Sequence, residues 1–199
     1  MIARAIPPVL MMAMLAATLA TTGCSVQQKG SNGNDDVKIQ TPVGGFNFKT
    51  NDAAIPAEIG LPAYPGAAVL KDDKSKGAAD IDMSFGDFHL RVRAVGYHTP
   101  DSPEKVRDFY RKELLRYGNV IECRDDRPVG TPSKTGEGLT CDEGKHITIS
   151  TVDRHARDEF ELKTGSKLHQ HIVAITPQSD GTKFGLVSLD LPLGEKQSN

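Results

Sequence analysis

Alternating apolar and polar residues between positions 79 and 95 predict a β-hairpin whose register can be deduced. The runs ADIDMSF and FHLRVRAV flank Gly86-Asp87, and a two-residue connection of this kind is typical of hairpins. The register pairs apolar residues on one face (Phe85–Phe88, Met83–Leu90, Ile81–Val92) and opposite charges on the other (Asp82–Arg91, Asp80–Arg93). Adjacent antiparallel strands favour such pairs, so we expect one apolar face and one solvated face with exposed ion pairs.

Further strands are predicted around this hairpin. In segment 37–50 apolar residues alternate on both sides of Gly44-Gly45, which indicates a second hairpin. Asp180-Gly181 separates two apolar runs and predicts a third. The other expected strands are 119–124, 146–152, 159–163, 168–176 and 183–191.

One amphipathic helix is predicted to begin near Pro103 and to end near Gly118. Proline suits a first helical turn, and Asp101 with Glu104 has the spacing of a capping box. The apolar residues recur every three or four positions: Val106, Phe109, Tyr110, Leu114 and Tyr117. Together with the strands, this pattern predicts an α+β fold: a mainly antiparallel sheet with one main helix packed on one face, in two layers.

An apolar run of different character occupies residues 9–20, after the basic residue Arg4. It is too short to cross a bilayer, which takes about 20 residues, but it has the length of the core of a signal peptide. We therefore expect residues 1–23 to be a signal peptide. Cleavage after Ala20, with release of a free secreted protein, is the alternative, and a buried helix of the domain is a third interpretation.

Gly23-Cys24 resembles the end of a bacterial lipoprotein signal, in which a small residue precedes the cysteine that is acylated. Thr21 departs from the aliphatic residue usual in that pattern. The resemblance implies a fatty acyl group such as palmitate on Cys24, which attaches the chain to a membrane of the cell envelope. Ser25 after the cysteine favours the outer membrane, on its periplasmic face.

The polar, Gly/Asn-rich segment 24–36 predicts a flexible tether after the lipidated cysteine. A single domain is expected over 37–193, and a disordered tail over 194–199. The other two cysteines, Cys123 and Cys141, flank a loop rich in Gly and Pro between two predicted strand ends, where an oxidising compartment favours a disulfide. Two free thiols, or ligands of a metal ion, are the alternatives.

Charge and composition exclude some classes of partner. The formal charge is −2, with 38% hydrophobic and 25% charged residues, which is typical of an ordinary soluble domain. Removing residues 1–23 takes away one basic residue, Arg4, and no acidic one. No basic surface for nucleic acid is therefore expected, nor strong attraction to anionic lipid headgroups.

Three segments resemble a group of uncharacterised bacterial lipoproteins: LPAYPGA, the helix SPEKVRDFYRKELLRYG, and the terminal QHIVAI and GTKFGLVSLDLP. The resemblance covers about residues 37–193. Turn residues and helix-packing residues dominate these motifs, so the motifs are moderately specific. The resemblance implies a small exported α+β domain. It implies no activity and assigns no catalytic residue.

Candidate chemistry is sparse. His169 and His171 share one face of a predicted strand and are weak candidates for a metal site, with Asp190 as a cross-sheet partner. Between strands, Asp153, Arg154, His155, Arg157, Asp158 and Glu159 form a polar cluster in which Asp and His could act as acid and base. A polar loop has this composition by default, and no familiar catalytic motif is present.

We therefore expect an exported, membrane-anchored lipoprotein that is not an enzyme and needs no cofactor. Its expected role is to present a sheet surface to an envelope protein or a small ligand. A small metal-dependent or acid–base hydrolase of the envelope is the alternative, and a purely structural envelope factor is a third.

Overall fold

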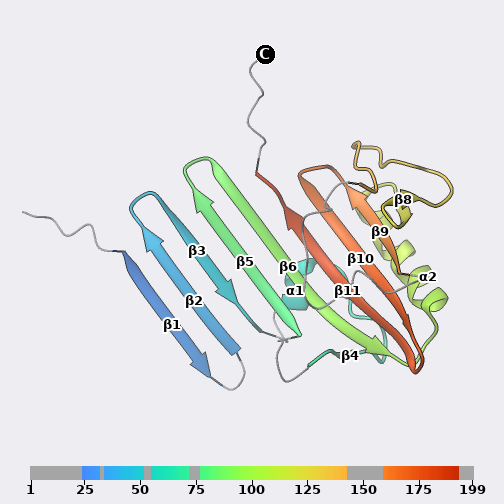
Figure 1. Cartoon of the computed structure of the whole chain (residues 1–199), viewed down its shortest axis with the longest axis horizontal. Helices are drawn as coiled ribbons and strands as arrows, with labels where there is room; N and C mark the ends of the chain where they lie inside the picture. Colours follow the sequence, from blue (N-terminus) through green and yellow to red (C-terminus); the bar gives the residue numbers. More distant parts are fainter. Residues whose placement is uncertain (1–23, 32–33, 52–54, 72–76, 143–158, 193–199) are drawn as a thin grey trace, which may run out of the picture.

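The chain folds around one antiparallel β-sheet with the strand order β1-β2-β3-β5-β6-β11-β10-β9-β7-β8, and β4 pairs with β6 outside this path (Figure 1). The computed structural model describes residues 24–31, 34–51, 55–71, 77–142 and 159–192. The strands are β1 (Ser25–Ser31), β2 (Asn34–Thr41), β3 (Gly44–Lys49), β4 (Ala68–Val69), β5 (Ala78–Phe85), β6 (Phe88–Thr99), β7 (Ile121–Arg124), β8 (Arg127–Pro128), β9 (Phe160–Gly165), β10 (His169–Gln178) and β11 (Gly181–Asp190). The helices are α1 (Ile55–Ile59), α2 (Pro103–Leu114) and the 3-10 turn η1 (Leu115–Tyr117).

The β5–β6 hairpin has the register predicted from its sequence. The observed pairs include Phe85–Phe88, Met83–Leu90, Ile81–Val92, Asp82–Arg91 and Asp80–Arg93. β3 continues this register, because Phe46 lies opposite Met83 and Phe48 lies opposite Ile81. The apolar face of one hairpin therefore extends over the neighbouring strands.

The predicted α+β fold, with one main helix on a sheet in two layers, is wrong. Strands and bridges hold 55% of the described residues and helices 14%, so the fold is β-rich. The predicted helix is present as α2, but its 12 residues are about 18 Å long. The ten strands in sequence across the sheet, about 4.8 Å apart, extend over about 43 Å. One such helix covers a few strands and cannot form a second layer.

The main core lies under the helices, on one face of the C-terminal half of the sheet. α2 buries Val106, Tyr110 and Leu114 there. The ring of Phe184 in β11 stacks on Tyr97 of β6, with 5.3 Å between centroids. The Tyr110 hydroxyl donates a hydrogen bond to the carbonyl oxygen of Pro62 at 3.1 Å, and burial raises the pKa of Tyr110. This hydroxyl therefore stays protonated and ties the 61–64 segment to α2.

The start of α2 differs from the predicted capping box. Ser102 is the N-cap residue and makes no side-chain capping bond. The Asp101 carboxylate instead accepts hydrogen bonds from Lys105 Nζ at 2.8 Å and the Tyr64 hydroxyl at 2.9 Å. These two donors lower the pKa of Asp101. Asp101 thereby joins the start of α2 to the core tyrosine Tyr64.

The predicted flexible tether over 24–36 is also wrong. β1 follows Cys24 directly, and its seven residues pair with β2 from Ser25–Gln40 to Ser31–Asn34. The polar composition that suggested a tether belongs to an edge strand, which has an unpaired side and tolerates residues such as Gln27 and Lys29. The ordered domain therefore begins at Cys24 rather than at residue 37.

Two further hairpins form as predicted, with their turns displaced by one or two residues. Thr41 pairs with Gly44, so Pro42-Val43 is the turn and the two glycines begin β3. A Cβ atom on Gly44 would meet the carbonyl oxygen of Ser84 at 2.2 Å, so glycine is required where β3 passes β5. Gln178 pairs with Gly181, which makes Ser179-Asp180 the third turn.

The predicted disulfide between Cys123 and Cys141 is present, with 5.6 Å between their Cα atoms. Both residues are buried beside Ile121. Lys163 of β9 also donates a hydrogen bond from Nζ to the carbonyl oxygen of Cys141 at 3.0 Å. The loop after β8 is therefore attached to the sheet by a covalent and a polar contact.

Several predicted features lie outside the described residues: the signal peptide 1–23, the strand 146–152 and the tail 194–199. Across the ranges that are described, no helix combines the length and the apolar character needed to span a membrane.

Candidate functional site: an uncovered sheet face backed by a charge cluster

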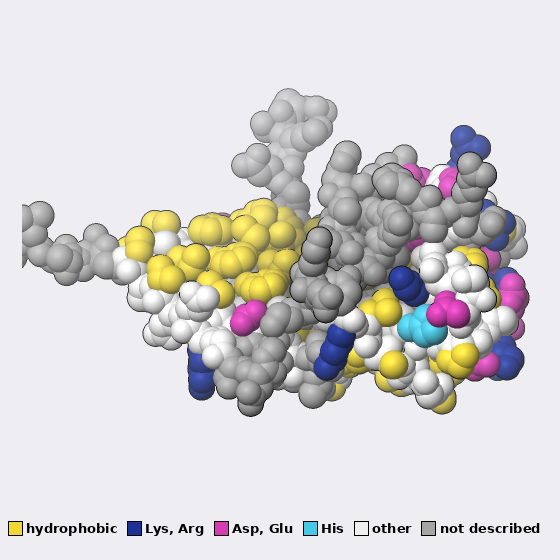
Figure 2. Space-filling view, turned by 60° about the horizontal axis from the view of Figure 1, so that its bottom comes forward, with side chains coloured by type: hydrophobic (Ala, Val, Ile, Leu, Met, Phe, Trp, Pro, Cys, Tyr) yellow, Lys and Arg dark blue, Asp and Glu magenta, His cyan; other side chains and the backbone are white. Residues whose placement is uncertain are grey.

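The face of the sheet opposite the helices is apolar across β2, β3, β5 and β6. Side chains alternate along each strand, so the registers bring two apolar residues from each strand to this side. The name "apolar face" is used below for these eight: Val37, Ile39, Phe46, Phe48, Ile81, Met83, Leu90 and Val92. Figure 2 shows the continuous apolar surface in this part of the molecule.

The apolar face is only half-buried, although its residues pack against one another. All eight side chains have intermediate exposure. Farther along the same side of the sheet, Ala94, Ile172 and Val187 are buried. The uncovered region is therefore confined to the N-terminal strands. Soluble monomers seldom expose a continuous apolar patch of more than a few hundred Å², and such patches mark binding sites.

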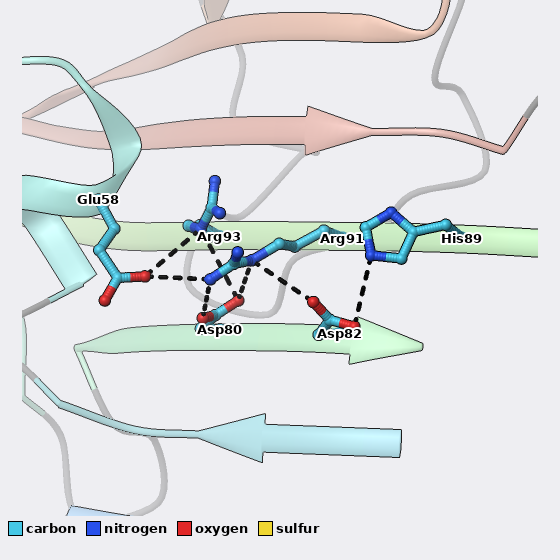
Figure 3. Close-up of polar contacts among 6 residues, drawn as sticks. All are labelled: Glu58, Asp80, Asp82, His89, Arg91 and Arg93. Carbon is cyan, nitrogen blue, oxygen red and sulfur yellow. Dashed lines mark hydrogen bonds and ion pairs between the residues drawn. The ribbon is translucent and has the colours of Figure 1, made fainter. Parts of the chain in front are cut away.

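The other side of the same strands carries charged residues, which gather where α1 meets β5 and β6 (Figure 3). Asp80 accepts two hydrogen bonds from Arg91, from Nε at 3.2 Å and from Nη2 at 2.9 Å. Arg91 Nη2 also lies 3.1 Å from the Glu58 carboxylate of α1, and Arg93 Nε lies 3.6 Å from it. These contacts hold α1 on the sheet.

The prediction of a solvated face is therefore corrected at Asp80, whose side chain is 5% exposed. Arg91 prefers the diagonal partner Asp80 over Asp82, its register partner, which lies 3.8 Å from Nε. The hydrogen bonds that Arg91 donates to Asp80 raise the pKa of Arg91, while burial opposes this. His89 lies 3.5 Å from Asp82. Each carboxylate of the cluster has a cationic or imidazole partner. We therefore interpret the charge cluster as a structural feature that stabilises the sheet and α1.

The two candidate histidines of β10 share a face, as predicted, but differ in their surroundings. His169 is 71% exposed, and its Nδ1 lies 3.0 Å from Asp190 of β11, the partner proposed from the sequence. His171 stacks on Tyr117, with 3.8 Å between ring centroids. The Tyr117 hydroxyl donates to the carbonyl oxygen of Gly60 at 2.6 Å, so this stack also supports the end of α1.

Burial lowers the pKa of His171 below the usual value of 6.5. A backbone hydrogen bond with Ile59 and the charge of Asp190 oppose this shift, while Arg116 and Arg93 add to it. His171 is therefore neutral at pH 7, packed between η1 and the sheet.

A further histidine–carboxylate pair lies in another part of the sheet. His98 of β6 is 3.4 Å from Asp180 in the β10–β11 turn, at the end of the sheet opposite the β5–β6 turn. Within the described residues, no group of three or more His, Cys, Asp or Glu side chains is arranged to bind a metal ion. The polar cluster of Asp153, Arg154, His155, Arg157 and Asp158 lies outside the described residues.

A shallow hollow lies over Gly45 on the charged side of β2, β3 and β5. Lys38, Gln40, Asn47, Asp82 and Ser84 are among its lining residues. The amide oxygen of Asn47 is buried and has no hydrogen-bond partner among the described residues. The hollow is a polar feature distinct from the apolar face behind it.

No protein-family model, no curated protein and no solved structure matches this chain. The resemblance to bacterial lipoproteins therefore stays a prediction.

Local alternation of apolar residues predicts each half of the apolar face separately. It indicates that Phe46 and Phe48 share one side of their strand and that Ile81 and Met83 share one side of theirs. Their adjacency depends on pairing between β3 and β5, which are separated by α1 and β4 along the chain. No local pattern reports such a pairing.

Replacing Asp80 tests the structural role of the charge cluster. In Asp80→Asn, Arg91 keeps a partner of the same size but loses the carboxylate charge, so we expect the free energy of unfolding to fall by about 2 kcal/mol. Asp82→Asn is the matched control on the same strand: the Asp82 side chain is 30% exposed, against 5% for Asp80, and such more accessible pairs contribute about 0.5 kcal/mol. Urea titrations measure both values, and equal losses in the two variants would contradict the assignment.

The lowered pKa of His171 predicts a stability that depends on pH. The unfolded chain, with its imidazole pKa near 6.5, takes up a proton at a higher pH than the folded protein does. The free energy of unfolding should therefore decrease as the pH falls from about 7 to about 5. His171→Phe keeps a ring on Tyr117 and should show a shallower decrease in urea titrations at each pH. An unchanged slope would show that other groups carry the dependence.

Proposed function

We propose that this chain is an exported, lipid-anchored envelope protein that acts by binding, without catalysis, through the apolar face. The single observation that carries the proposal is the uncovered apolar surface of β2, β3, β5 and β6, which the helices of the described chain leave open. Burying apolar side chains is favourable by about 25 cal/mol per Å² of surface removed from water. Leaving this surface exposed to water therefore costs free energy unless a partner covers it.

Two features of the cysteines support export and anchoring. The Cys123–Cys141 disulfide is of a kind that persists in oxidising compartments. Cys24 is the free cysteine of the described residues, and it is exposed at the start of β1. An acyl group on this exposed side chain would leave the pairing of β1 with β2 intact.

The arrangement of polar residues supports binding over catalysis. The carboxylates of the charge cluster are engaged by Arg91, Arg93 and His89, and they hold α1 in place. His171 is stacked and half-buried, and His169 is paired with Asp190 on the surface. A catalytic site needs a nucleophile, a base and a binding cleft to converge, whereas these groups stabilise separate parts of the sheet.

The intact mass of the native protein tests the anchor. We expect a chain that begins at Cys24, carries acyl groups on that residue and is lighter by two hydrogens for the Cys123–Cys141 bond. An unmodified chain that begins at Thr21 would support ordinary cleavage after Ala20 and refute the anchor.

Photocrosslinking on β2 tests the binding surface, because consecutive residues of this strand face opposite sides. We expect p-benzoylphenylalanine at Ile39, on the apolar face, to form crosslinks in intact cells. The same group at Lys38, which is more exposed but faces the charged side, is the matched control and should remain uncrosslinked. Equal yields at both positions would show contact without preference for the apolar face and would contradict the proposal.

A further inference from the structure

Exposed large apolar side chains gather at one end of the sheet. Six such side chains occur in the described part of the chain, and four of them lie at this end: Val26 (67% exposed), Val43 (75%), Phe85 (44%) and Phe88 (41%). The other two, Leu115 and Val129, follow α2 and β8. The large apolar side chains are thus most exposed at this one end of the sheet.

Cys24 lies at the same end. Ser25 pairs with Gln40, so Cys24 is beside Thr41, the last residue of β2. Thr41 pairs with Gly44, Gly44 with Phe85, and Phe85 with Phe88. In Figure 1 the start of β1 and the β2–β3 and β5–β6 turns lie at the same end of the strands. Cys24 and the four exposed apolar side chains therefore share what is called below the Cys24 end.

We propose that the Cys24 end rests on the lipid surface, with Val43, Phe85 and Phe88 inserted between lipid headgroups. This inference rests on the proposed function, because acylation of Cys24 would bring this end to the bilayer. Since β1 begins at the next residue, less than about 4 Å of chain separates the anchor from the sheet. An acylated Cys24 leaves no room for a water layer between the sheet end and the membrane.

The shape and charge of the Cys24 end favour lipid over a second copy of the chain. Val43 and the two phenylalanines lie at or beside tight turns, which project from the sheet instead of forming a flat surface. Fluid lipid fills the space around projecting side chains, whereas a rigid partner needs a matching cavity. The turns Pro42-Val43 and Gly86-Asp87 carry one charged residue, Asp87, so the contact does not depend on anionic headgroups.

A single thiol at position 43 tests this contact in the lipid-anchored protein. Acylation would block Cys24 and the disulfide occupies the other cysteines, so Val43→Cys offers one site for an environment-sensitive fluorophore. Ser179→Cys, in the exposed turn at the opposite end of the sheet, is the matched control. Both proteins are reconstituted in phosphatidylcholine vesicles that contain lipids with a nitroxide on the acyl chain.

We expect the label at position 43 to be quenched by the nitroxide lipids and to be several-fold less accessible to iodide than the label at 179. Adding Phe85→Ser and Phe88→Ser to Val43→Cys should restore access to iodide without changing the acylated mass. This variant separates insertion of the side chains from mere closeness to the anchor.

Three results would overturn the proposal: equal iodide access at 43 and 179, protection at 43 that survives the two serine substitutions, or protection without nitroxide quenching in a protein of doubled mass. The last result would identify a second copy as the occupant. Failure of the proposed anchor is distinguishable, because an unacylated Cys24 would take up a second label. Nitroxide quenching at 43 in that doubly labelled protein, lost with the serines, would still support lipid contact.

Discussion

The pairing of β5 with β6 is the constraint on which the rest of the structure depends. This hairpin joins the N-terminal strands β1–β3 to the C-terminal strands, and its register decides which side chains face each way across the N-terminal part of the sheet. A shift by one residue would move Ile81 and Met83 to the side of α1 and would remove Asp80 from Arg91. The apolar face and the charge cluster are therefore two results of one register.

The two sides of this hairpin are stabilised in different ways. Beneath α1, the buried carboxylate of Asp80 pairs with the partly buried Arg91, and Glu58 links this pair to the helix. On the other side, the apolar side chains have, among the described residues, only their neighbours in the sheet to pack against. The helices lie on the opposite side of the sheet, so no described helix offsets the cost of exposing this side. A partner or a lipid surface supplies the missing contact in our proposal.

Features set by neighbouring residues were predictable from the sequence, and features set by distant contacts were not. The β5–β6 register, α2 and the Cys123–Cys141 bond follow from alternation, helical spacing and cysteine count. The pairing of β3 with β5 and the burial of Asp80 depend on α1, a five-residue helix too short to give a periodic signal. Polar residues suit an edge strand and a tether equally, so the composition of residues 25–31 does not identify β1. Without this strand, the sheet predicted from the sequence is narrower than the observed one.

Because β1 begins at the residue after Cys24, modification of this cysteine and assembly of the sheet are linked. In our proposal Cys24 is acylated, and the residues that follow it are those of β1. An enzyme that binds these residues competes with β2 for their backbone hydrogen bonds, so we expect acylation to precede the pairing of β1 with β2. Among the described strands, β1 pairs with β2 alone, so the remaining strands can assemble first. Its late addition would then act as the last step of maturation, completing the domain as the chain reaches the membrane.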